Sequence, residues 1–292
     1  MMLQETPNIG EMLMHHTSDA HEIAFESPFG GELFTIHLPR WEPVHVGRFA
    51  MDLSPTKHVV FMIVAAFLVW LTMYLTGRAL QKQRARGEPP RGLASMFESM
   101  VLFARNDIAV ANIGHGGEKF APYIMTLFFF ILYMNLLGLM PWGATATGNL
   151  AVTGGLALTA GLTIEISGMR ALGPKGYMKT IVFAPPGTTG VTRVLLTAIM
   201  IPVEIIGKIV KPFALCLRLF ANMTSGHFVI LSLLGLIFLF GSGPALIRWG
   251  VAGGSVVFVL FMMSLELLVA FLQAYIFALL TSVFIGLMQH EH

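Results

Sequence analysis

The amino-acid sequence predicts an all-α integral membrane protein. Hydrophobic residues make up 55% of its 292 positions and charged residues only 12%, about half the charged share of an ordinary soluble domain. Several apolar stretches approach or exceed the roughly 20 residues that a helix needs to cross a bilayer. The composition therefore excludes a soluble domain, and the net charge of +2 gives no indication of a nucleic-acid partner.

About five membrane crossings and one amphipathic interfacial helix account for the apolar pattern. The amphipathic helix is expected over residues 93–108, where apolar residues recur at helical spacing, and it should lie at the cytoplasmic interface. The last two crossings are much longer than a bilayer requires, so we expect tilted helices that form an antiparallel hairpin. The expected crossings are Val59–Thr76, Phe120–Trp142, Ala151–Ile166, about 191–240 and about 245–289.

The charges between the crossings predict the orientation of the chain. Residues 1–55 are polar, with eight acidic and two basic residues, and residues 56–292 form a single transmembrane helical domain. The first crossing is followed by five basic residues opposed by one glutamate, which places this loop in the cytoplasm and the N-terminus outside. Five crossings then leave the C-terminus in the cytoplasm. The histidines of the N-terminal segment fit no metal-ligand spacing, and we expect no metal and no cofactor.

Arg218 is the only full charge between Phe213 and Phe240. An arginine in the middle of a membrane helix costs roughly 2.5–3.5 kcal/mol, so such residues usually face a polar cavity or an opposite charge. Polar residues also recur on one face of this helix, and they predict either a partner surface or a water-filled path. The alternative is a helix packed inside a bundle, with Glu204 neutralising Lys208. The face consists of Glu204, Lys208, Lys211, Leu215, Arg218, Asn222 and Ser225.

The last helix carries matching polar residues. Glu266 is its only charge between Val251 and Met288, and Gln273 follows seven residues later on the same face. If Gln273 is level with Arg218 in an antiparallel pair, His227 lies about 13 Å and Glu266 about 10 Å from that level toward the outside. A histidine and a carboxylate at similar depth are suited to relaying protons, although a static hydrogen-bonded pair is the alternative.

Four segments resemble subunit a of F-type ATP synthases. The two most specific are Leu217-Arg-Leu-Phe-Ala-Asn-Met-Thr-Ser-Gly-His227 and Phe271-Leu-Gln-Ala-Tyr-Ile-Phe277, and the others are Met134-Asn-Leu-Leu-Gly-Leu-Met-Pro141 and Thr56-Lys-His58. The resemblance covers residues 50–289. It implies a proton-conducting stator subunit of the bacterial inner membrane, beside a ring of c-subunits, with peripheral-stalk b subunits and the rest of the synthase as partners.

The resemblance also implies roles for individual residues. Arg218 would face the c-ring from the helix pair at about 191–289, with Gln273 and Asn222 beside it. Glu204 would belong to a cytoplasmic half-channel, whereas His227 and Glu266 would line a periplasmic one. Asn135 is a further candidate for proton translocation that only the resemblance supports. Lys211 and Ser225 are candidates because they lie on the polar face of the helix. Other members have an aspartate where Gly138 stands, so that acidic site is not carried over.

Two further classes of protein stay open at this point. A secondary transporter would also place charges at mid-membrane, but such folds usually show internal repeats, and none is found here. A purely structural membrane anchor needs no arginine at such a position. The chain has no nucleotide-binding glycine loop, so any ATP chemistry would belong to partner subunits, and the chain is not expected to be catalytic on its own.

Overall fold

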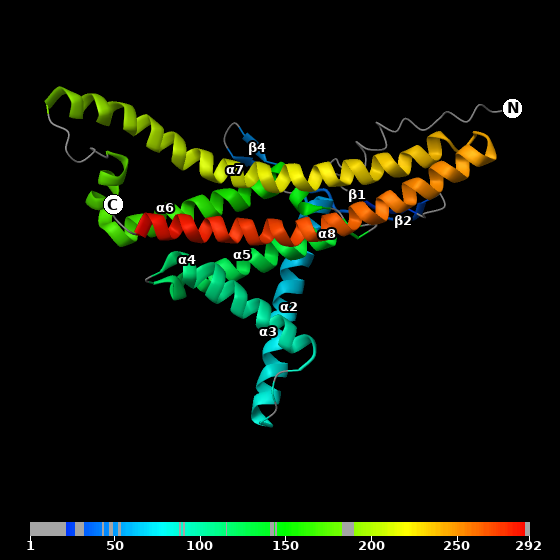
Figure 1. Cartoon of the computed structure of the whole chain (residues 1–292), viewed down its shortest axis with the longest axis horizontal. Helices are drawn as coiled ribbons and strands as arrows, with labels where there is room; N and C mark the ends of the chain where they lie inside the picture. Colours follow the sequence, from blue (N-terminus) through cyan, green and yellow to red (C-terminus); the bar gives the residue numbers. More distant parts are fainter. Residues whose placement is uncertain are drawn as a thin grey trace. The chain divides into compact units, whose positions relative to one another are not determined.

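Long α-helices dominate the computed structural model of the chain (Figure 1). It describes residues 22–26, 32–42, 44–46, 49–51, 54–87, 89, 91–114, 116–140, 143, 145–182 and 190–289. The predicted all-α class is confirmed. The longer helices are α2 (Lys57–Ala85), α3 (Leu93–Leu102), α5 (Gly117–Gly138), α6 (Leu150–Ile181), α7 (Gly190–Leu239) and α8 (Ala245–Gln289).

Two short β-hairpins precede the helices, and the sequence pattern did not predict them. Strand β1 (Glu22–Glu26) pairs antiparallel with β2 (Glu32–His37), and β3 (Val44–Val46) pairs with β4 (Phe49–Met51). The side chains of His37 and Glu22 lie opposite each other and approach to 3.3 Å. The predicted polar segment therefore contains regular structure before α2. Most of its histidines lie outside the described residues.

Four helices are long and apolar enough to cross a membrane within the described residues: α2, α5, α6 and α8. The chain is therefore a multi-pass membrane protein, as predicted. The 50-residue helix α7, which coincides with the expected crossing at 191–240, is not among the four. At 1.5 Å per residue it is about 75 Å long and α8 about 68 Å, so both far exceed the roughly 30 Å hydrocarbon core.

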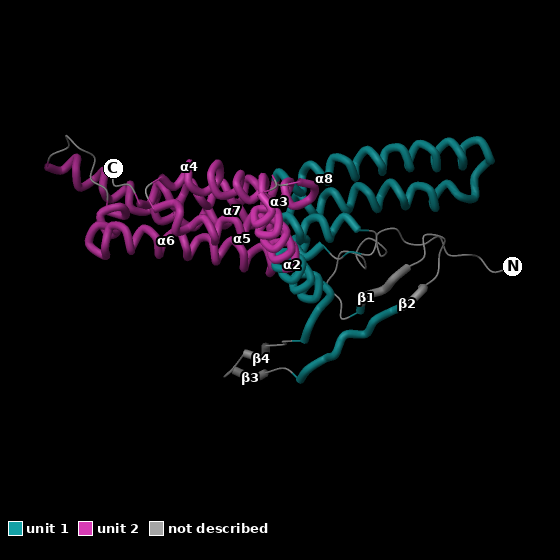
Figure 2. The backbone as a smooth tube through the Cα atoms, turned by 90° about the horizontal axis from the view of Figure 1, so that it is seen from below, with its two compact units in different colours: residues 1–70, 131–149, 220–272 teal, residues 71–130, 150–219, 273–292 magenta. Residues whose placement is uncertain are grey.

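The chain divides into two compact units, which Figure 2 shows in different colours. Unit 1 comprises residues 1–70, 131–149 and 220–272, and unit 2 comprises residues 71–130, 150–219 and 273–292. In unit 1 the end of α7 and the start of α8 run side by side and are joined by a tight turn at 240–244 (Figures 1 and 2). This part of the predicted antiparallel hairpin is confirmed.

Unit 2 contains the predicted amphipathic helix. It begins as α3, continues as the π-helix η1 (Phe103–Val110) and ends in the short α4 (Ala111–Ile113). Ala104 and Ile108 are fully buried, whereas Leu93 and Met96 are exposed. The Phe103 ring stacks on Tyr275 of α8 at 5.8 Å between ring centroids. One side of this segment therefore packs on the helices of unit 2.

Helix α6 extends beyond the predicted end of its crossing at Ile166. It reaches Ile181, but Gly173 interrupts its helical backbone with φ 70° and ψ 167°. The next residue, Pro174, disfavours helical backbone at the position before it, and only glycine adopts such a positive φ without strain. Arg170, Lys175 and Lys179, which follow the predicted crossing in the sequence, are therefore carried by the end of α6.

The packing of Gly286 leads to a stability prediction. A Cβ added there would lie 3.2 Å from the Cα of Ile113 and closer still to the carbonyl oxygen of Asn112, whereas a Cβ at Gly155 would meet nothing within 4 Å. We expect Gly286→Ala to lose roughly 1–3 kcal/mol through overpacking. Gly155→Ala should be neutral or gain up to roughly 1 kcal/mol from helix propensity. Thermal unfolding of the purified variants tests this, and equal melting temperatures would contradict it.

Candidate functional site

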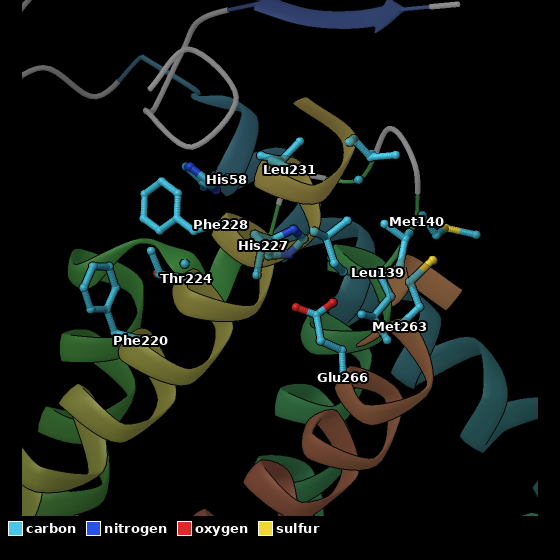
Figure 3. Close-up of a pocket in the computed structure, with 17 residues that line it drawn as sticks. His58, Leu139, Met140, Phe220, Thr224, His227, Phe228, Leu231, Met263 and Glu266 are labelled. Carbon is cyan, nitrogen blue, oxygen red and sulfur yellow. Dashed lines mark hydrogen bonds between the residues drawn. The ribbon is translucent and has the colours of Figure 1, made fainter. Parts of the chain in front are cut away.

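A cavity of about 620 Å³ lies in unit 1, between the parts of α5, α7 and α8 that this unit contains (Figure 3). Most of its wall is apolar, with Leu139, Phe228 and Met263 among the lining residues. Two predicted site residues, His227 of α7 and Glu266 of α8, also line it. The cavity has the size and the mostly apolar lining of a binding site with a few converging polar groups.

Glu266 is the most unusual side chain in this cavity. It is only 6% exposed, and neither carboxyl oxygen has a hydrogen-bond partner among the described residues. The facing residue on α7 is Gly226, where a Cβ would overlap the carboxyl group. The glycine therefore leaves the space that the carboxyl group occupies. A buried carboxyl group without partners is costly, and a cavity that admits water or exchanges protons would account for it.

His227 is held by a residue that the sequence pattern did not identify. Its Nε2 forms a hydrogen bond with the Oγ1 of Thr145, and Thr145 is 8% exposed and lines the same cavity. No bond joins His227 to Glu266 among the described residues. The alternative of a static His–carboxylate pair therefore finds no support in this geometry.

Gly138, the position at which the resemblance to subunit a would allow an aspartate, also lines the cavity. A Cβ at this position would lie 2.5 Å from Thr145 Oγ1 and 2.9 Å from Met223 Cε. The Thr145 hydroxyl thus occupies the space that a side chain at position 138 would need. In this chain the group bonded to His227 is therefore a hydroxyl.

Asn135 is fully buried and links three segments of unit 1. Its Nδ2 donates to the backbone carbonyl of Ala270 at 3.2 Å. Its Oδ1 accepts a hydrogen bond of 2.8 Å from the hydroxyl of Thr147, in the short 3₁₀-helix η2 (Ala146–Gly148). The side chain thereby connects α5, η2 and α8, and its contacts are those of a structural residue.

The remaining predicted residues on the polar face of α7 have different surroundings. In unit 2, Arg218 is partly exposed and has no ion pair within the described residues, and Gln273 is 6% exposed. In unit 1, Asn222 and Ser225 are exposed, and the Ser225 hydroxyl donates to the carbonyl of Asn222 at 3.0 Å. The structure leaves Arg218 and Asn222 accessible on the helix that was predicted to face a partner.

Lys208 pairs with Glu165 of α6 and not with Glu204. Its Nζ lies 3.1 Å from the Glu165 carboxylate and 3.2 Å from the hydroxyl of Tyr177, which itself donates to Glu165. Neither Glu165 nor Tyr177 was identified from the sequence, because their pairing depends on contacts between α6 and α7.

Glu204 is partly exposed and makes no ion pair within the described part of the chain. Lys211 lies over the Phe284 ring at 5.1 Å.

The ion pair of Lys208 leads to a second stability prediction. Lys208→Met should leave Glu165 with only Tyr177 as a partner and lower the free energy of unfolding by about 1.5–3 kcal/mol, the usual contribution of a hydrogen bond to a charged group. The matched variant Lys211→Met removes a cation–π contact, which contributes roughly 0.5–1 kcal/mol at exposed sites. Thermal unfolding of both purified variants tests the order. A larger loss for Lys211→Met would disprove it.

Comparisons with known proteins identify the family to which the chain belongs. Residues 50–286 match the family model described as ATP synthase A chain. ATP synthase subunit a of Chloroherpeton thalassium is 48% identical over 95% of this chain and 77% of its own length. The corresponding values are 45%, 95% and 72% for ATP synthase subunit a 2 of Chlorobaculum tepidum, and 41%, 94% and 92% for ATP synthase subunit a of Myxococcus xanthus. The chain belongs to the ATP synthase A chain family.

Proposed function

We propose that this chain is the proton-conducting stator subunit of a rotary ATP synthase. It provides two offset half-channels to carboxyl groups on a ring of c-subunits, and Arg218 separates the two half-channels. Proton flow through them turns the ring and couples to ATP synthesis or hydrolysis in partner subunits. The peripheral-stalk b subunits and membrane lipid complete its surroundings in the bacterial inner membrane.

The observation that carries this proposal is the cavity of unit 1. Glu266 brings a buried carboxyl group that has no hydrogen-bond partner among the described residues, and His227 brings an imidazole. Histidine exchanges protons near neutral pH, and ionisable groups inside a membrane domain usually mark an ion path. We assign this cavity to the half-channel on the outer side, with residues 1–55 also outside and residues 56–292 as the membrane domain.

Arg218 supplies the electrostatic switch in this proposal. A ring carboxyl group that faces lipid must be protonated, because a bare charge is costly there. Close to a fixed guanidinium the ionised form is favoured, so the carboxyl group releases its proton into one half-channel. Arginine suits this role because it stays charged at any working pH, whereas a desolvated lysine can lose its proton. Partial exposure and the absence of an ion pair within the described residues leave Arg218 available to such a partner.

The inner half-channel is assigned to the part of α7 that contains Glu204. This carboxylate is partly exposed, and the neighbouring Lys208 is already paired with Glu165. We therefore assign Glu204 as the acidic residue of this half-channel. Gln273 and Asn222 are assigned as polar neighbours of the arginine, with Lys211 and Ser225 on the same helix.

The direct test replaces Arg218 by alanine in the assembled synthase. We expect ATP-driven acidification of inverted membrane vesicles to be lost, with or without a new passive proton leak, because the charge that discharges the ring and blocks direct proton flow is gone. The amount of assembled complex is measured in both samples. Normal pumping by this variant would disprove the proposal and leave a secondary transporter or a structural anchor.

Glu266→Gln separates proton transfer from packing. Because neither carboxyl oxygen has a hydrogen-bond partner among the described residues, the amide should assemble as well as the wild type. Proton pumping should fall by about 10²-fold, the lower end of what a positioned proton-transfer group contributes. Vesicle acidification normalised to assembled complex provides the measurement. Wild-type pumping would remove Glu266 from the path, and poor assembly would favour a structural role.

A further inference from the structure

Hydrogen bonds at both ends of the short backbone segment 145–147 connect His227 to the helix that carries Glu266. Thr145 bonds to His227, and its own carbonyl accepts a hydrogen bond from the backbone N–H of Gly148 at 2.9 Å, which closes the turn of η2. Within the same turn, the Thr147 hydroxyl donates to Asn135, which donates to the carbonyl of Ala270. Ala270 lies one helical turn after Glu266 on α8.

These hydrogen bonds are well protected from competition by solvent. Asn135 and Thr147 are both 0% exposed, and Thr145 is 8% exposed. Inside a protein such bonds are electrostatically stronger than in water, and a fully satisfied network makes its surroundings rigid. The short segment 145–147 therefore has fixed contacts with a residue on α7 and, through Asn135, with α8.

A hydroxyl group suits a site next to a histidine that gains and loses protons. It donates to Nε2 when that nitrogen is unprotonated and accepts from it when it is protonated. The bond to His227 can thus persist through a proton-transfer cycle by rotation of the hydroxyl alone. A carboxylate next to His227 would favour the charged imidazolium form instead. A side chain at position 138 would come within 2.5 Å of the Thr145 hydroxyl, so Thr145 would have to move to admit it.

We propose that Thr145 is a positioning residue for proton transfer, because its hydroxyl orients the His227 ring in both protonation states. The bonds of Thr147 and Asn135 fix the position of η2, and therefore of this ring, relative to the part of α8 that carries Glu266. This inference rests on the proposed function and adds to it a residue that determines the geometry of the half-channel. Thr145 itself carries no proton of the transported flux.

The test uses the assembled synthase in inverted vesicles and compares Thr145→Val with Thr145→Ser. Valine keeps the shape and removes the hydroxyl, whereas serine keeps the hydroxyl. We expect valine to lower ATP-driven pumping about two- to tenfold, as loss of one hydrogen bond implies, and serine to pump like the wild type. If the valine variant does not assemble, Thr145→Ala is measured against Thr145→Ser with the same expectation.

The pH profile distinguishes positioning from a general loss of structure. Among the described residues, the titratable side chains that line the cavity are His58, His227 and Glu266. Hydrogen bonds to a charged group are stronger than those to a neutral one, so loss of the hydroxyl disfavours the imidazolium form of His227. The pumping profile of Thr145→Val should therefore shift to lower pH, and that of Thr145→Ser should not shift.

Two further threonines provide controls. Thr281→Val removes a buried hydroxyl that bonds within its own helix and is not among the residues that line the cavity, and it should leave the pH profile unchanged. Thr224 lines the same cavity, but its hydroxyl has no partner among the described residues. Thr224→Val should therefore lower pumping less than Thr145→Val.

Three results would overturn the inference: wild-type rate and pH profile in Thr145→Val, equal defects in Thr145→Val and Thr145→Ser, or equal defects in Thr145→Val and Thr224→Val. Each leaves the proposed function intact if Arg218→Ala still abolishes pumping. Normal pumping by Arg218→Ala would instead remove the proposed function itself, whatever the threonine variants do.

Discussion

The cavity of unit 1 depends on the buried amide of Asn135. In a largely apolar protein an unpaired amide is expensive, so both ends of this side chain must find partners. They do so with the Thr147 hydroxyl and the Ala270 carbonyl, and these two bonds hold η2 between α5 and α8. Thr145 lies two residues before Thr147, so the position of its hydroxyl against His227 follows from the same constraint. Glu266 lies one helical turn before Ala270. Its carboxyl group lines the cavity but has no hydrogen-bond partner among the described residues.

Small residues make this arrangement sterically possible. Gly226 leaves room for the Glu266 carboxyl group, and Gly138 leaves room for the Thr145 hydroxyl. An aspartate at position 138 would overlap Thr145 and add a charge beside an imidazole. The glycine at position 138 therefore leaves the space in which the Thr145 hydroxyl bonds to His227.

The basic residues on the polar face of α7 have different neighbours. Lys208 is compensated internally by Glu165 and Tyr177, and Lys211 lies over an aromatic ring of α8. Arg218 has no such compensation within the described residues, which is consistent with a partner outside the chain. Two of the basic residues on this face therefore stabilise the bundle of unit 2. In the function proposed above, a neighbouring subunit would offset the desolvation cost of this arginine.

Much of the architecture follows from the sequence because it depends on local rules. Long apolar stretches predict membrane helices, the helical period brings Arg218 and Lys211 to one face, and a lone charge in an apolar helix, such as Glu266, marks a polar site. These signals need only neighbouring residues. The roles of Thr145, Glu165 and Tyr177 do not follow in this way, since Thr145 meets His227 across 82 positions of sequence and Glu165 meets Lys208 across 43. The tertiary structure alone decided these pairings, because helical period and hydropathy specify which face of a helix is polar but not which distant side chain comes to lie against it.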